Sequence, residues 1–231
     1  MLSLAHKTAG KIKISGKLKK AYKILGAIRD LQLQQQRMPE AIKQEPDKPQ
    51  AYLNLLQKEI DELKAELSKL FLQNPVTENK KKTDSLVPDE FPLNSFRYFV
   101  QQKEATVTGI IVSGHFRDDN FHTIRKTLKD LFYNLKIYKG IEHDLLSLSV
   151  WKGKDEQYFD PLLDELGNFQ DKCTAIGLLN ANRLNNLNEY DREPLERIKK
   201  EWRKDKAGMK QLMVNKWKND VSPVADVPKL S

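Results

Sequence analysis

The sequence predicts a small α/β plait-like sandwich, in either an α+β or an α/β arrangement, preceded by a coiled-coil helix and followed by a basic C-terminal helix. Three observations predict this fold. Apolar residues recur at heptad spacing over residues 51–73, and strand-like apolar runs alternate with amphipathic patterns over residues 91–190. Lysine and arginine dominate residues 191–219. The 231 residues allow one ordinary domain with long extensions.

Residues 1–38 are expected to form a basic arm followed by a helix. They contain nine basic residues and one acidic residue, Asp30, so they carry the whole formal net charge of +8. Such asymmetry indicates an anionic partner, with RNA more probable than DNA, or another polyanion. An organelle-targeting segment and a membrane-surface helix remain as alternatives. Three prolines over residues 39–50 predict a linker.

Residues 51–73 carry the most regular pattern in the chain. Leucine and isoleucine occupy heptad positions a and d over three repeats: Leu53, Leu56, Ile60, Leu63, Leu67 and Leu70. The pattern predicts an oligomerisation helix that binds a second copy or a protein partner. The alternative is an intramolecular hairpin packed against residues 18–36. Residues 74–90, which include Lys80–Lys82 and Pro88, are expected to be a polar linker.

The expected α/β domain spans residues 91–190. Strands are predicted at residues 105–114, 144–151 and 173–179, because these short runs are apolar and rich in β-branched residues. Helices are predicted between them, the first with a buried face of Phe121, Ile124, Leu128, Leu131, Phe132 and Leu135. The helix over 191–219 is followed by a tail, 220–231, that is expected to be disordered.

Catalytic motifs are missing from the sequence, which favours a protein that is not an enzyme and that holds no cofactor and no metal. His115, Asp119 and His122 could together ligate a metal, but acidic residues there also suit the start of a helix. His143 lies between two acids, one of which could orient it as a general base, yet neighbouring residues on a strand face opposite ways. Cys173, the single cysteine, fits a buried inert thiol.

Nucleic-acid contacts are expected from the arm and from the C-terminal helix. The predicted residues are Lys7, Lys11, Lys13, Lys17, Lys19, Lys20, Lys23, Arg29, Arg203, Lys204 and Lys206. Trp202 and Trp217 interleave with these basic residues and could stack on bases. The alternative places Trp202 in the domain core.

Part of the chain resembles the ribosomal stalk-base protein family, over about residues 109–182. The resemblance rests on Ile110–Val112, Thr123–Leu128, Leu135–Lys139 and Thr174–Leu178. It implies RNA and the translation machinery.

The basic arm, the heptad pattern and the family resemblance together predict a non-enzymatic structural or assembly protein. We expect it to associate with RNA or a ribonucleoprotein, with the mitochondrial translation machinery as a possible setting. The alternative is a coiled-coil scaffold or adapter whose basic arm is a targeting or membrane-surface element. No apolar run is long enough to span a membrane, and the single cysteine favours an intracellular location, the mitochondrial matrix or the cytoplasm.

Overall fold

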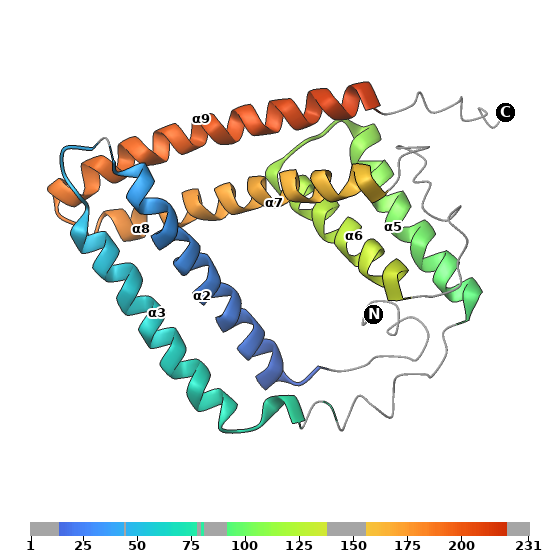
Figure 1. The fold of residues 1–231 in the computed structure, drawn as a ribbon, viewed down its shortest axis with the longest axis horizontal. Helices are drawn as coiled ribbons and strands as arrows, with labels where there is room; N and C mark the ends of the chain where they lie inside the picture. Colours follow the sequence, from blue (N-terminus) through green and yellow to red (C-terminus); the bar gives the residue numbers. More distant parts are fainter. Residues whose placement is uncertain (1–13, 44, 78–79, 81–91, 138–155, 221–231) are drawn as a thin grey trace. The chain divides into compact units, whose positions relative to one another are not determined.

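Every secondary-structure element that the structure describes is an α-helix (Figure 1). The computed structural model describes residues 14–43, 45–77, 80, 92–137 and 156–220. The helices are α2 (Gly16–Ala41), α3 (Gln50–Phe71), α5 (Leu93–Ser113), α6 (Asp118–Ile137), α7 (Glu156–Leu178), α8 (Ala181–Leu184) and α9 (Glu189–Asp220). The predicted α/β plait-like sandwich is therefore wrong, because no strand occurs within these residues.

Two of the three predicted strands are helical, and their buried residues explain why. Val107 and Ile111, in the predicted strand 105–114, are buried four residues apart, which is the repeat of one helix face. Ala175 and Leu179 show the same spacing in the predicted strand 173–179. Packing of these faces overrides the β propensity of a short apolar run. The predicted strand 144–151 lies outside the described residues.

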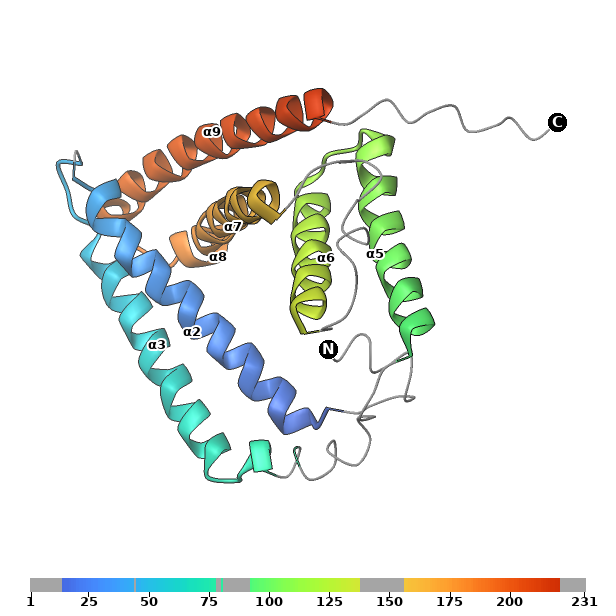
Figure 2. The same ribbon diagram turned by 45° about the vertical axis from the view of Figure 1, so that its right-hand side comes forward.

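The chain forms two compact units, each built around a pair of antiparallel helices that Figures 1 and 2 show. The α2–α3 unit also contains the end of α7, the short α8, and α9 up to residue 207. The α5–α6 unit also contains α7 up to residue 170, and α9 from residue 208. Each unit thus buries the apolar stripes of its own helix pair against segments of two long helices.

The core of the α2–α3 unit joins α2 and α3 to the ends of α7 and α9. Ile24 and Ile28 of α2 pack in one cluster with Leu56 and Ile60 of α3 and with Trp202 of α9. The heptad leucines that are not fully buried, Leu53, Leu63, Leu67 and Leu70, pack against the same cluster. The hairpin alternative predicts this packing. Self-association through these residues stays a prediction.

A polar pair is buried inside this unit. The amide Nε2 of Gln34 donates a hydrogen bond to the hydroxyl of Tyr52 across 3.0 Å, and neither side chain is exposed. Burial raises the pKa of Tyr52 to about 12, although the hydrogen bond from Gln34 opposes this increase. The start of α3 is fixed nearby, because the Asp191 carboxylate accepts a hydrogen bond of 2.9 Å from the backbone N–H of Ala51.

Aromatic rings form the centre of the α5–α6 unit. Trp217 of α9 is fully buried, and its ring stacks on Phe121 of α6 with centroids 5.2 Å apart. Phe121 also meets Phe169 of α7 at 4.8 Å, and Phe116 meets Trp217 edge-on at 5.6 Å. Gly114, which adopts a left-handed φ of 66°, ends α5 and lets the chain turn toward α6.

Crossing a bilayer takes a helix of about 20 mostly apolar residues. None of the described helices is both long enough and apolar enough to do so.

Candidate functional site

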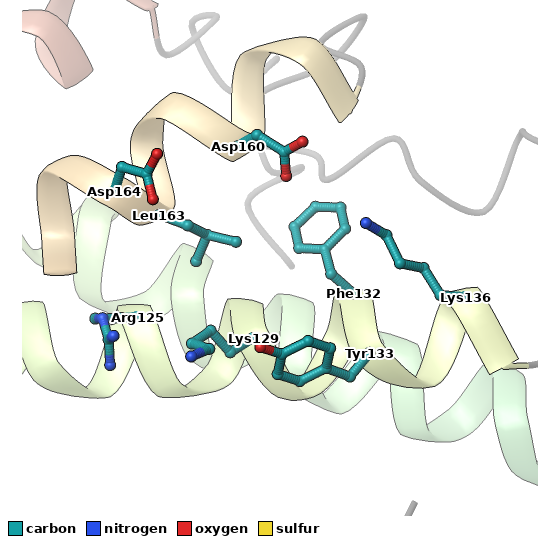
Figure 3. A pocket seen from close by; sticks show the side chains of 8 residues that line it. All are labelled: Arg125, Lys129, Phe132, Tyr133, Lys136, Asp160, Leu163 and Asp164. Atoms are coloured by element: carbon teal, nitrogen blue, oxygen red, sulfur yellow. The ribbon is translucent and has the colours of Figure 1, made fainter.

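A groove between α6 and the first half of α7 gathers charged side chains within the α5–α6 unit (Figure 3). Its volume is about 420 Å³. Helix α6 contributes basic and aromatic side chains, and α7 contributes two carboxylates and a leucine. The lining residues are Arg125, Lys129, Phe132, Tyr133, Lys136, Asp160, Leu163 and Asp164. We call this feature the α6–α7 groove.

The basic residues of the groove share one face of α6. Lys129 follows Arg125 by four residues and Lys136 follows it by eleven, which is close to three whole helical turns. The neighbouring stripe of α6 is apolar and fully buried, so it fixes the helix against the core. On α7, Asp160 and Asp164 are likewise four residues apart and point toward the groove (Figure 3).

Arg125 is the most constrained of these side chains. Its Nε atom is buried and has no hydrogen-bond partner among the described residues. The guanidinium lies against the backbone of α7 at Gly167, where a Cβ would stand 3.6 Å from Nε. An unpaired buried donor costs free energy, about 1–3 kcal/mol and more when it is charged. The fold therefore leaves one N–H donor of this guanidinium without an acceptor, while the side chain lines the groove.

Lys129 follows Arg125 by one helical turn and has no carboxylate partner within the described residues. Its Nζ atom lies 5.4 Å from the centroid of the Tyr133 ring, at cation–π distance. Asp160 and Asp164 line the same groove, yet neither forms an ion pair with Arg125 or Lys129 within 4.0 Å. Two cationic groups thus remain unneutralised in the groove.

Other lysines of the α5–α6 unit are neutralised by the fold. Lys103 pairs with Asp130 across 2.8 Å, and Lys216 of α9 pairs with Glu165 of α7 across 2.9 Å. Partial burial and short distances make these pairs part of the packing. Arg125 and Lys129, in contrast, line the α6–α7 groove and form no ion pair with the two carboxylates beside them.

The chemistry of the groove is that of anion recognition. A planar guanidinium offers two parallel N–H groups to phosphate or carboxylate oxygens, and an ammonium adds a strongly hydrated point charge. Histidine, cysteine and serine, which commonly serve as nucleophile or base, do not occur among the lining residues.

The lysines predicted to bind nucleic acid lie away from this groove. Lys17, Lys19 and Lys23 are exposed on α2, and within the described residues they make no ion pair. Lys20 is paired with Glu66 of α3 across 2.7 Å. The remaining arm lysines, Lys7, Lys11 and Lys13, lie outside the described residues.

The other predicted contacts belong to the α2–α3 unit as well. Arg29 lies 3.9 Å from the Asp171 carboxylate, and Lys204 pairs with Glu201 of its own helix across 2.9 Å. Arg203 is exposed on α9. Lys206 is half-buried and interacts with its surroundings. None of the predicted nucleic-acid-binding side chains that the structure describes lines the α6–α7 groove.

Base stacking by Trp202 or Trp217 is ruled out by their burial. Trp217 is fully enclosed and Trp202 is only 8% exposed. The ammonium of Lys172 lies over the Trp202 ring at 5.4 Å. Both rings stabilise the cores of their units, as the alternative for Trp202 predicts.

The residues weighed as metal ligands do not meet. His122 Nδ1 lies 3.0 Å from the amide oxygen of Gln170, and Asp119 pairs with Arg117 across 3.3 Å. No group of three potential metal ligands occurs within the described residues. His143 and its acidic neighbours lie outside them, and Cys173 is half-buried within α7.

The sequence did contain a signal for the groove, namely basic residues that recur on one face of a predicted helix. Arg125, Lys129 and Lys136 form a basic stripe that a helical projection of residues 118–137 reveals beside the apolar stripe. Counting charge by segment hides this stripe, because α6 also carries acidic residues.

Within the described residues, these observations define a helical protein of two compact units, with a groove in one of them whose basic lining could accept an anion. The chain belongs to the CHAD domain family, because the model of the CHAD domain matches residues 7–180, well over half of the sequence. The matched range includes α6 and α7, and α9 follows it.

The match overturns the resemblance to the ribosomal stalk-base family. The prediction of an RNA-binding ribosomal protein is therefore corrected, because nothing in the family match connects the chain with ribosomes or RNA. No curated protein and no solved structure matches the chain.

Proposed function

We propose that the chain is a non-enzymatic binding protein for phosphate-bearing polyanions, and that the α6–α7 groove binds their phosphoryl oxygens. The observation that carries the proposal is the Arg125 guanidinium, whose Nε is buried without a partner beside the unneutralised Lys129. A phosphate offers several acceptor oxygens to these donors, and a polymer of phosphates adds the gain of repeated contacts.

Helix α7 would determine how such a ligand lies. Asp160 and Asp164 repel an anion from the α7 side and leave the basic stripe of α6 as the favourable side. The exposed ring of Tyr133 borders this stripe and adds a hydroxyl donor at its edge. The groove therefore favours a narrow chain of phosphates that runs along α6.

Titration of labelled inorganic polyphosphate, followed by fluorescence anisotropy over a range of salt concentrations, tests the proposal. Arg125→Gln should weaken binding roughly 10- to 100-fold, because a hydrogen bond to a charged group contributes about 1.5–3 kcal/mol. It should also lower the log–log salt slope by about 0.7–0.9, the share of one phosphate contact.

Lys126→Gln is the matched control. Lys126 is the next residue of the same helix, it is exposed, and it does not line the groove, so its loss removes the same charge elsewhere. We expect its affinity to stay within about twofold of wild type at moderate salt, since an exposed charge contributes little. Equal losses in both variants, or no binding by the wild type, would refute the groove. A single-stranded RNA of matched charge shows whether the site distinguishes bare phosphate chains from nucleotides.

A further inference from the structure

Figure 1 shows that α2 begins beside the end of α3, and both of these segments carry exposed apolar side chains. Leu72, directly after α3, is 86% exposed. Phe71 and Val76 beside it in the sequence are 41% and 51% exposed. On α2, Tyr22 is 79% exposed and Leu25 is 46% exposed. These five residues form what we call the hairpin-end patch.

The two helix ends that carry the patch are held together by the fold. The ammonium of Lys20 pairs with the Glu66 carboxylate across 2.7 Å, which joins the start of α2 to the last turns of α3. Leu67 and Leu70, on the inner side of α3, pack against the core cluster that contains Ile24. The patch therefore lies on a helix pair whose inner residues are packed. Its own side chains are exposed because they point away from that packed side.

Lysines surround the patch, and almost nothing neutralises them. Residues 14–25 and 63–77 contain six lysines and a single acid, Glu66, a net charge of +5. Glu66 is engaged by Lys20. Lys19 and Lys23 lie three residues before and one residue after Tyr22, and Lys69 is next to the exposed end of α3. None of these three lysines makes an ion pair within the described residues.

We propose that the hairpin-end patch docks the protein onto an anionic lipid surface. Lysines next to exposed leucine and aromatic side chains are the composition of interfacial segments: the ammonium groups stay among the lipid phosphates, while the apolar side chains enter the headgroup boundary. Tyr22 suits that boundary because its ring is apolar and its hydroxyl is polar. A soluble polyanion would use the lysines but would gain nothing from Leu72.

This docking goes beyond phosphate binding in the α6–α7 groove and uses different residues. The experiment is co-sedimentation of the full chain with vesicles of phosphatidylcholine alone and of phosphatidylcholine mixed with phosphatidylglycerol. We expect binding only to the anionic vesicles. Leu72→Gln should reduce that binding by roughly tenfold or more, the factor for withdrawing one leucine side chain from an apolar phase.

Leu212→Gln is the matched control, since Leu212 of α9 is 72% exposed and lies outside the patch. It should bind vesicles like the wild type, as should Arg125→Gln, whose effect is confined to the groove. The double variant Lys19→Gln, Lys23→Gln should lose binding as the charge attraction falls.

Three results would overturn the docking surface. The first is equal sedimentation with neutral and anionic vesicles, and the second is equal binding by the two leucine variants. The third is a wild-type dimer that Leu72→Gln converts to a monomer, which would assign the patch to a second copy of the chain. Circular dichroism of each variant confirms that the fold is kept.

Discussion

Replacing Tyr52 by phenylalanine tests how the α2–α3 unit tolerates its buried polar pair. The substitution removes the hydroxyl that accepts the hydrogen bond from Gln34 Nε2. Gln34 is fully buried, its Oε1 already has no partner, and its remaining contact is with the Met38 sulfur at 4.0 Å. A buried amide left unpaired costs about 1–3 kcal/mol, so we expect the unit to lose that much stability at neutral pH.

The pH dependence of the free energy of unfolding offers a second, independent measure of the contribution of Tyr52. The pKa of Tyr52 rises to about 12 in the folded chain from its ordinary value of 10.0, because burial disfavours the phenolate. The group therefore contributes its stability fully below pH 10, and this contribution is lost as the pH rises through 12. The shift of about two pKa units corresponds to a free energy of roughly 3 kcal/mol.

The assay is urea denaturation at a series of pH values. The quantity compared is the difference in the free energy of unfolding between wild type and Tyr52→Phe. The difference removes the titration of the lysines, which both proteins share. The wild-type advantage should be constant up to pH 10 and should disappear by about pH 12. Tyr22→Phe, at a hydroxyl that is 79% exposed, serves as control and should change stability by less than about 0.5 kcal/mol. A neutral effect of Tyr52→Phe, or an advantage that does not depend on pH, would refute the reasoning.

Two further predictions follow from the groove and from the aromatic core. Asp164→Asn removes a carboxylate from the lining of the groove where we propose that phosphates bind. Polyphosphate affinity should therefore rise roughly two- to fivefold at low salt and converge with wild type at high salt in the anisotropy assay. Unchanged or weaker binding would contradict the placement of the ligand along α6. Trp217→Ala empties the centre of the α5–α6 unit, where the indole stacks on Phe121, and should cost about 3–5 kcal/mol in urea denaturation. A loss below about 1 kcal/mol would show that this core is not tightly packed.

The long amphipathic patterns of the sequence predicted real helices. The heptad over residues 51–73 corresponds to α3, and the buried face expected for residues 118–135 is the buried face of α6, with Phe121, Ile124 and Leu128 all enclosed. In these stretches the apolar residues repeat over four or five turns, so the period identifies the helix.

The short apolar runs misled the prediction. Residues 106–112 read Thr-Val-Thr-Gly-Ile-Ile-Val, which is typical of a strand when the run is taken alone. Only a longer window shows that Phe96, Val100, Val107 and Ile111 keep the helical repeat across 16 positions of α5. At the end of α7, glycines and the apolar run after Cys173 concealed the same continuity, because a short buried run fits either element.

Net charge by segment was a poor guide to the groove because several cations of the C-terminal helix form ion pairs with carboxylates of their own unit. The C-terminal helix has a strong basic excess, yet Arg197 is held by Glu45 at 2.8 Å, Lys210 by Asp118 at 3.3 Å and Lys216 by Glu165 at 2.9 Å. These cations stabilise the packing of α9 and are costly to redirect toward a ligand. Arg125 lies on a helix of ordinary charge, but within the described part of the chain its guanidinium pairs with no carboxylate and its buried Nε has no partner. An anion should bind more favourably to an unpaired, partly buried cation such as Arg125 than to a cation held in an ion pair. Folding has already removed part of the water from Arg125, so binding does not have to do so. We therefore expect Arg125 to contribute more to polyanion binding than any of these paired residues of α9.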